Sequence, residues 1–219
     1  MTSQIKRFSW ARPKAFSIAL RDGSFALAQS LHSPYIAFFD LFSQDNRWDG
    51  CLLSAERLMY INPVTRQFLR RATLYPVQEV APIAPPLPSR WIHQSPRAQT
   101  VMVFGDTDDA MDIMTFGADG ATLVEKDILR GGPGKHPSGI YDRVVIETIA
   151  DEDDATIDGH ELMSVAVYPN VNERLLLNKL MGHRRDPMKD LQFNKPIPTN
   201  YLTFMKIISG KHRLSDLGY

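Results

Sequence analysis

Five prolines between Pro76 and Pro88 constrain this chain more than any other feature of its sequence. Proline fixes its own φ angle, has no amide hydrogen to donate and disfavours helix at the residue before it. The segment is therefore expected to be an extended, semi-rigid connector rather than a helix. The predicted regions are an N-terminal half over 1–75, the connector over 76–100, a second half over 101–182 and a basic C-terminal extension over 183–219. The alternative is that these regions form one compact domain.

Alternating apolar residues predict that the N-terminal half is β-structure. Phe16 and Ile18 fall on one face of a strand, Asp22-Gly23 supplies a turn, and residues 25–29 resume the alternation. This pattern predicts a hairpin. The uninterrupted apolar run 35–39 indicates a third strand that is covered on both faces. Strands spaced this closely predict a curved antiparallel sheet or a small barrel.

The second half is also predicted to be rich in strands. Residues 101–104 and 111–116 are expected strands. The glycine-containing turn 117–120 is expected to bring residues 121–124 back against 111–116. Two further segments fit either a strand or a helix, 54–61 and 140–149.

Few helices are expected, and they lie toward the end of the chain. One is predicted over 171–181, with Asn170 as its N-cap, one buried apolar stripe and Gly182 as its end. A short helix is predicted near 199–208. The fold class is therefore α+β, with a β-rich N-terminal half followed by a second β-rich half that carries a few helices.

The composition excludes several classes of protein. Hydrophobic residues make up 43% of the 219 residues and charged residues 23%, which is ordinary globular usage. Lys and Arg number 25, as do Asp and Glu, which argues against a dedicated nucleic-acid binder and a polybasic membrane protein. A single cysteine, Cys51, fits a reducing compartment. With no signal core and no membrane span in the sequence, a cytoplasmic location is expected.

Local motifs for catalysis do not fit their templates. The run 131–135 is glycine-rich, but Leu129 and His136 stand where a phosphate loop needs glycine and Ser or Thr. The acidic segment 106–112 lacks the glycine of a calcium loop. No catalytic residue, metal ligand or cofactor is therefore expected.

The charges are unevenly distributed along the chain. From Asp106 to Glu161 there are 15 acidic residues and four basic ones, whereas from Val171 onward nine basic residues face four acidic ones. These segments are either solvated faces that partly pair with each other, or they include an acidic surface centred on 151–154 that docks a basic protein. The candidate binding residues are Asp106, Asp108, Asp109, Asp112, Glu147, Asp151, Glu152, Asp153, Asp154 and Asp158, with Trp48, Trp91 and Tyr168 as candidate aromatic anchors.

Three segments resemble the immunity protein 26 family, whose members accompany polymorphic toxins in bacteria. Residues 16–29 read FSIALRDGSFALAQ, similar to the family's opening strand, Asp-Gly turn and second strand. Residues 36–41 read IAFFDL, an apolar run that closes on an acidic residue. Residues 165–174 read VAVYPNVNER, similar to the family's closing strand and helix. The resemblance covers about residues 13–182.

The resemblance implies an immunity protein that is not an enzyme and neutralises a cognate bacterial toxin or effector by occluding its active site. An acidic surface suits a toxin with a basic cleft, as a nuclease needs for its phosphates. Neither a membrane nor nucleic acid is expected as a direct partner. The family contributes no catalytic residues, and matched positions such as Asp22 and Phe38 are expected to have structural roles.

Two other functions stay open. In one, Asp106, Asp108, Asp112 and His160 converge on a metal ion in a small cytoplasmic enzyme. In the other, the protein is an adaptor or chaperone that loads an effector for secretion. Metal analysis of the purified protein tests the first alternative, and a toxicity assay tests the second.

Overall fold

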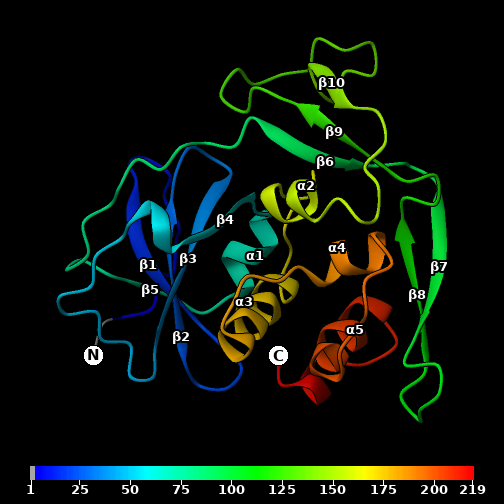
Figure 1. Cartoon of the computed structure of the whole chain (residues 1–219). Helices are drawn as coiled ribbons and strands as arrows, with labels where there is room; N and C mark the ends of the chain where they lie inside the picture. The colour runs from blue at the N-terminus through cyan, green and yellow to red at the C-terminus, as the bar shows by residue number, and fades with distance from the viewer. Residues whose placement is uncertain (1–2) are drawn as a thin grey trace. The chain divides into compact units, whose positions relative to one another are not determined.

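The computed structural model describes residues 3–219 and divides the chain into two compact units (Figure 1). Unit 1 comprises the described residues up to Pro86 together with Ser164–Arg185 and His212–Tyr219. Unit 2 comprises Leu87–Met163 and Asp186–Lys211. These boundaries differ from the predicted linear division, because the chain returns to each unit after leaving it. The α+β class is confirmed, with strands dominant.

Unit 1 is built on an antiparallel five-stranded sheet of order β4-β3-β2-β1-β5. The predicted hairpin is confirmed: Phe16 of β1 lies opposite Ala28 of β2, and Gly23 in the turn has a φ of 84°. The sheet is open, so the small-barrel alternative is wrong. The elements of unit 1 are β1 (Lys14–Ala19), β2 (Phe25–Ser30), β3 (Tyr35–Ser43), the 3₁₀ helix η1 (Ala55–Arg57), β4 (Leu58–Pro63), α1 (Arg66–Arg71), β5 (Leu74–Pro76), α3 (Asn170–Met181) and the 3₁₀ helix η3 (Leu214–Leu217).

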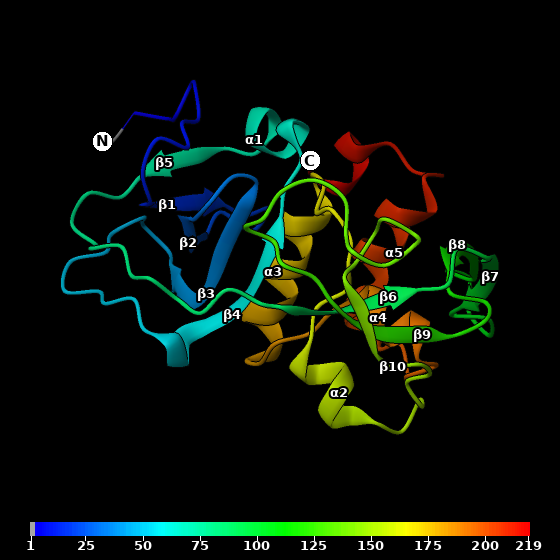
Figure 2. The same cartoon turned by 90° about the horizontal axis from the view of Figure 1, so that it is seen from above.

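Helices cover one face of this sheet. Phe16 and Phe38 belong to a hydrophobic cluster that includes Phe68 of α1 and Leu175 of α3. Figure 2 shows α3 lying along the sheet beside β4. Residues 36–39 of β3 are all fully buried, which confirms the prediction of a strand covered on both faces.

Loops cover the other face, where polar side chains complete the packing. The hydroxyl of Ser17 donates to Asn46 Oδ1 at 2.6 Å, and the same oxygen accepts the indole N–H of Trp48 at 2.9 Å. The amide side chain of Gln29 donates to the Ile83 carbonyl at 2.6 Å and accepts the Ile83 amide at 2.9 Å. The proline-rich connector has no regular secondary structure between β5 and β6, and these bonds fix it along the sheet.

Helix α3 is more buried than its sequence predicts. Residues 171–178 are all buried, so the expectation of a single apolar stripe is wrong. The N-cap position belongs to Pro169 and not to Asn170, which is already helical. Gly182, with a φ of 69°, ends the helix as predicted.

Polar residues of α3 can be buried because other residues of unit 1 form hydrogen bonds and ion pairs with them. Glu173 accepts two hydrogen bonds from the Arg21 guanidinium, at 2.8 and 3.0 Å, and one from the hydroxyl of Tyr219. Burial and the Glu173 carboxylate raise the pKa of Tyr219 well above its ordinary value. Six residues further along the helix, Lys179 forms a 2.6 Å ion pair with Asp22. The β1–β2 turn and α3 therefore hold each other in place.

Unit 2 contains two small antiparallel sheets. Three strands pair in the order β10-β9-β6, and β7 pairs with β8 as a two-stranded ribbon. Of the two ambiguous segments, 140–149 forms a strand, whereas 54–61 forms a 3₁₀ turn followed by a strand. The elements of unit 2 are β6 (Arg90–Gln94), β7 (Ala98–Val103), β8 (Met111–Phe116), β9 (Ala121–Glu125), β10 (Arg143–Ile146), α2 (Asp154–Gly159), α4 (Pro187–Gln192), the 3₁₀ helix η2 (Thr199–Tyr201) and α5 (Leu202–Ser209).

The predicted pairing of residues 121–124 with 111–116 is wrong. A turn does form, with Gly117 at a φ of 100°, but it directs β9 to β6 and β10. The turn is bound to α4, where Gln192 donates its side-chain amide to the Gly117 carbonyl at 3.2 Å. A Cβ atom at position 117 would lie 1.9 Å from Gln192 Oε1. The helix side chain therefore occupies the space beside the turn, and the φ of 100° at this position also favours glycine.

The C-terminal segment 183–219 is part of the fold and not a separate extension. Phe193 is 2% exposed and packs in the core beneath the three-stranded sheet. The buried ammonium of Lys189 donates to the carbonyls of Ile157 and His160, at 2.7 and 3.0 Å, in the last turn of α2 and just after it. The predicted helix near 199–208 is confirmed by α5.

Substituting Arg21→Ala tests the contact between the β1–β2 turn and α3. The change leaves the carboxylate of Glu173, which is 1% exposed, without its cation. Breaking a buried ion pair from one side costs about 3–5 kcal/mol. Because Arg21 itself is partly exposed, we expect a loss of about 2–3 kcal/mol in the free energy of unfolding, measured with urea and circular dichroism.

The matched control is Arg47→Ala, which breaks the exposed pair between Arg47 and Asp45. Exposed pairs contribute less than about 1 kcal/mol, so little change is expected. Equal effects of the two substitutions would contradict the role assigned to Arg21.

Candidate functional site

The β7–β8 ribbon presents large apolar side chains on its outer face. In the antiparallel register Met102 lies opposite Asp112, and Thr100 lies opposite Met114. Opposite residues share a face of the sheet, and so does Phe116, two residues beyond Met114. The three apolar side chains Met102, Met114 and Phe116 are 68%, 79% and 58% exposed.

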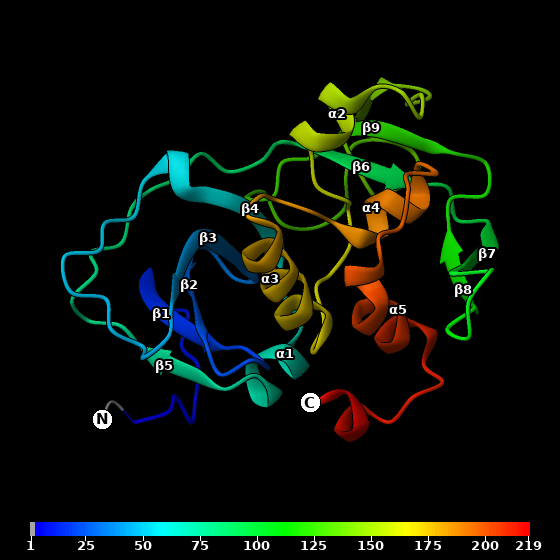
Figure 3. The ribbon, with the colours of Figure 1, turned by 60° about the horizontal axis from the view of Figure 1, so that its bottom comes forward.

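The inner face of the ribbon is buried. Val103, Ile113 and Thr115 alternate with the exposed residues and are all buried. Helix α5 contacts β8, and Figure 3 shows the two side by side. The ribbon is therefore an integral part of unit 2 that leaves one apolar face uncovered.

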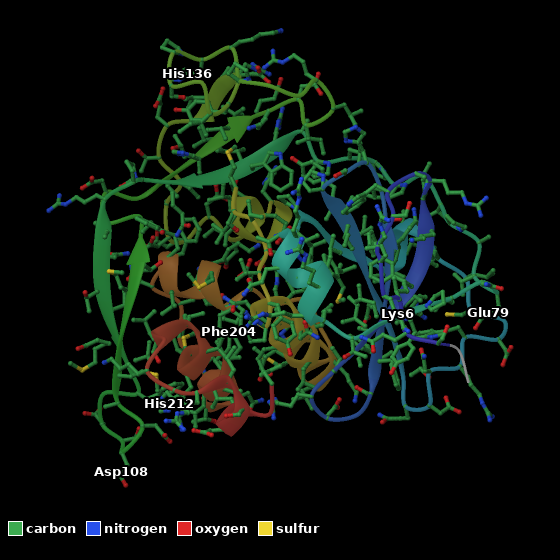
Figure 4. All side chains as sticks on the ribbon, turned by 180° about the vertical axis from the view of Figure 1, so that it is seen from behind. Lys6, Glu79, Asp108, His136, Phe204 and His212 are labelled. Carbon is green, nitrogen blue, oxygen red and sulfur yellow. The ribbon has the colours of Figure 1, made fainter. Side chains whose placement is uncertain are left out.

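All formal charges along this ribbon are negative. From Ala98 to Glu125 the sequence contains six Asp or Glu residues and no Lys or Arg. Asp112 is exposed on the outer face, and Asp106 and Asp108 are exposed in the loop that joins the strands. Figure 4 shows Asp108 at the far tip of the ribbon. The ribbon surface is defined as Met102, Asp106, Asp108, Asp112, Met114 and Phe116.

Hydrogen bonds within the β7–β8 loop order it. The amide and the hydroxyl of Thr107 both donate to the Phe104 carbonyl, at 3.0 and 2.9 Å. Thr107 Oγ1 in turn accepts the Asp109 amide at 3.2 Å. The Asp109 carboxylate forms a 2.8 Å ion pair with Lys206 of α5. Of the predicted binding residues in this region, Asp109 is thus engaged within the unit.

The other predicted acidic residues gather around α2. Asp153 caps this helix by accepting the Thr156 amide at 3.1 Å, and hydrogen bonds from Thr156 lower the pKa of Asp153. Asp154 forms a 2.6 Å ion pair with Lys195. Asp151 accepts a 2.7 Å hydrogen bond from the side-chain amide of Asn194. The remaining predicted residues are exposed: Glu147, Glu152 and Asp158.

The ten predicted acidic residues therefore form two groups instead of one surface. The loop of the ribbon and helix α2 lie well apart in unit 2 (Figures 1 and 3). In each group part of the charge is neutralised by lysines of the segment 186–211, as in the interpretation that acidic and basic faces pair.

The zero net charge of the chain conceals two oppositely charged units. Unit 1 contains 15 Lys or Arg and 8 Asp or Glu residues, a formal charge of +7. Unit 2 contains 10 Lys or Arg and 17 Asp or Glu residues, a formal charge of −7. The ribbon surface therefore belongs to a strongly acidic unit.

Two of the three predicted aromatic anchors are buried. Trp48 and Trp91 are 4% and 2% exposed, so the expectation that they serve as exposed anchors is wrong. Burying an indole removes a large apolar area from water, and the N–H of Trp48 keeps a partner in Asn46. Tyr168 is half-buried, in edge-to-face contact with Tyr219 at 5.9 Å between ring centroids.

The residues of the alternative metal site do not meet. Asp106, Asp108 and Asp112 lie in the β7–β8 loop and at the start of β8. His160 follows α2, where its Nδ1 atom lies 2.9 Å from the Thr156 carbonyl oxygen. Among the described residues, no group of three or more His, Cys, Asp or Glu side chains is arranged to hold a metal ion.

The glycine-rich loop between β9 and β10 is organised by one carboxylate. Asp142 accepts the backbone amides of Asp127 and Lys135, at 2.8 and 2.9 Å, and the guanidinium of Arg130 at 2.6 Å. These hydrogen bonds lower the pKa of Asp142 to about 2. The loop thus has a defined structure that depends on an ionised carboxylate.

Sequence reasoning missed the apolar residues of the ribbon surface, although a signal was present. Residues 111–116 are apolar at both odd and even positions, apart from Asp112 and Thr115. This pattern is typical of a strand covered on both faces. Only the structure reveals that the second face of this strand has no cover in the described part of the chain.

Fold and surface together define a two-unit α+β protein whose acidic unit exposes an apolar ribbon. In a comparison with protein-family models, residues 5–195 match DUF8309, which is described as a domain of unknown function. The chain therefore belongs to the DUF8309 family. Comparisons with curated proteins and with solved structures gave no match. Within residues 3–219, no helix combines the length and the apolar composition that a membrane crossing requires.

Acidification is expected to release the loop held by Asp142. The pKa of this carboxyl is depressed from 3.8 to about 2, so its hydrogen bonds are fully present above about pH 4 and are lost as the pH falls through 2. The amide chemical shifts of Asp127 and Lys135, followed by NMR, should move with a midpoint near pH 2.

Asp142→Asn should shift the same two amides already at neutral pH. Asp119→Asn, which removes the exposed partner of Arg97, should leave them in place and serves as the control. A midpoint near pH 4 in the unmodified protein would contradict the assignment.

Proposed function

We propose that the protein is a cytoplasmic immunity protein that binds a cognate bacterial toxin and blocks its active site. It acts by occupying the toxin and not by catalysis. The nature of the partner rests on the resemblance to the immunity protein 26 family, since DUF8309 is described without a function. We place the contact with the toxin on the ribbon surface.

The exposure of Met102, Met114 and Phe116 is the observation that carries this proposal. Large neighbouring apolar side chains on a folded surface are typical of a site that binds another protein. Methionine suits such a site because its flexible thioether adapts to irregular partner surfaces. Phe116 adds an aromatic ring of the kind that often dominates binding energy.

The charge of the ribbon surface favours a basic partner. Asp112 lies opposite Met102, Asp106 and Asp108 lie in the adjoining loop, and unit 2 as a whole carries a formal charge of −7. Such a surface accelerates association with a positive cleft and repels acidic proteins. A nuclease toxin has such a cleft because it must bind phosphates.

Co-purification with the product of the neighbouring toxin gene tests the proposed function. The two proteins should co-elute in size-exclusion chromatography, and this protein should protect cells that express the toxin. Binding without protection would indicate the adaptor or chaperone alternative. The proposal fails if the two proteins do not associate and the cells are not protected.

The double substitution Met102→Ala and Met114→Ala should weaken toxin binding by about 10- to 100-fold in calorimetry, because buried anchor residues each contribute more than about 1 kcal/mol. The control is Leu52→Ala with Leu180→Ala, which removes equally exposed apolar side chains from unit 1. Equal losses in the two double variants would locate the contact elsewhere.

Neutralising Asp106, Asp108 and Asp112 with the amide substitutions should slow association about 10-fold at low salt, with a smaller effect at 0.5 M salt. The matched control is Glu147→Gln, Glu152→Gln and Asp158→Asn, which changes the net charge equally near α2. Stopped-flow association rates distinguish the two triple variants. A greater effect of the α2 variant would favour the surface centred on residues 151–154.

A further inference from the structure

We infer that the free edge of strand β7 is a strand-addition site, which pairs with an extended, basic-flanked segment of the partner protein. This inference rests on the proposed function and specifies its contact: main-chain hydrogen bonds along β7 supplement the apolar face of the ribbon. Three observations support it, namely the direction of the backbone groups of β7, a cleft along its edge and the carboxylates that follow Phe104 at one end of that cleft.

The register shows which backbone groups of β7 point outward. The Gly117 amide donates to the Arg97 carbonyl at 3.0 Å, which makes this a hydrogen-bonded pair at the start of the ribbon. Hydrogen-bonded and non-hydrogen-bonded pairs alternate along an antiparallel ribbon. Thr100 and Met102 belong to non-hydrogen-bonded pairs, so their N–H and C=O groups point away from β8. In the described chain β7 pairs only with β8, and this edge is therefore open to a new strand.

A cleft of about 340 Å³ runs beside this edge. It is lined by the consecutive residues 101–104 and by residues of α4 and the segment after it, namely Asp190, Leu191, Asn194, Lys195 and Ile197. Lys195 is paired with Asp154. A cavity over one face of a strand would be lined by alternate residues, because successive side chains point to opposite faces. Consecutive lining residues therefore indicate a cleft along the edge of β7. Its volume is at the small end of the range for ligand pockets, about 300–1,000 Å³, and suits a short extended segment.

The lining and its surroundings define the chemistry of the occupant. The lining is mixed: Val101, Leu191 and Ile197 are apolar, whereas Asp190, Asn194 and Lys195 are polar or charged. An apolar side chain that enters the cleft would contact the first three residues. Asp106 and Asp108 follow directly after the cleft residue Phe104, so a basic residue should flank the added strand.

The experiment uses the full-length, ¹⁵N-labelled protein and a synthetic peptide, acetyl-Lys-Val-Thr-Val-Thr-Val-Lys-amide. Hydrogen exchange followed by NMR should show at least 10-fold slower exchange of the Met102 amide when the peptide is saturating. A peptide with N-methylated central valine, which cannot donate there, should protect this amide much less. A peptide with glutamate at both ends should bind more weakly than the lysine peptide.

Two variants separate the backbone contribution from the side chain. Both Met102→Ala and Met102→Pro remove the thioether, but only the proline removes the outward N–H, which is not used in pairing with β8. Met102→Pro should therefore bind the peptide about three- to ten-fold more weakly than Met102→Ala, the effect of one hydrogen bond. If the proline variant does not fold, the exchange measurement on the unmodified protein decides.

Three outcomes overturn the inference: equal affinity of the two folded variants, no protection of the Met102 amide by the peptide, or protection that depends on protein concentration alone. The last would mean that a second copy occupies the edge. A toxin that co-elutes without protecting this amide overturns strand addition but leaves the proposed function intact. If the peptide protects this amide but the toxin does not bind, the proposed function is overturned and the strand-addition site is retained.

Discussion

The burial of both faces of the five-stranded sheet is the constraint on which the rest of unit 1 depends. Neighbouring residues such as Phe16 and Ser17 point to opposite faces, and both are fully buried. Other segments of the chain must therefore pack on both faces of this sheet, because its own hairpins lie within the sheet and cover neither face. One layer is α3, which begins more than 90 residues after the last strand of the sheet. The other includes the proline-rich connector, bound through Gln29.

This constraint explains why unit 1 is discontinuous in sequence. The polar residues that such a helix buries need partners for their charges. In the β1–β2 turn, Arg21 pairs with Glu173 and Asp22 pairs with Lys179. The same turn is the Asp-Gly feature that gives the N-terminal segment its hairpin. A short local motif thus serves two levels of structure, because it reverses the chain and docks the helix.

The ribbon of unit 2 differs from this sheet, since the described part of the chain covers only one of its faces. A two-stranded ribbon is marginal by itself, and contacts with α5 on the inner face hold it in place. Stability does not require apolar residues on the outer face, where Thr100 already shows that a polar β-former fits. Met102, Met114 and Phe116 stand there nevertheless, exposed to water. The binding of a partner, as proposed, would offset the cost of this exposure.

Sequence reasoning succeeded where structure is decided within a few residues. The β1–β2 hairpin, the end of α3 at Gly182 and helix α5 all follow from local pattern. It failed where strand pairing and contacts are long-range, as at Gly117, whose turn leads β9 to β6 and is bound by Gln192, 75 residues later in the chain. It also failed for Trp48, whose burial depends on a loop conformation that places Asn46 beside Ser17.

The candidate site illustrates the same division. Composition along the chain revealed the acidic residues of unit 2, because charge runs are visible without a fold. The sequence did not reveal that these acidic residues form two groups. It also did not reveal that one group lies beside an exposed apolar face, because that depends on strand register. The register also decides which amides of β7 face outward, and a shift by one residue would have turned the same methionines inward.

The separation of +7 and −7 between the units bears on how a partner meets the ribbon. Salt screens charges beyond about 8 Å at physiological ionic strength. A compact unit of about 100 residues has a radius of gyration of about 13 Å, which exceeds this distance. Within unit 2, the carboxylates that lie within this distance of the ribbon therefore contribute most to the field that an approaching protein meets there. The overall balance of charge, which argues against a nucleic-acid binder, is for this reason compatible with a surface that selects a strongly basic protein.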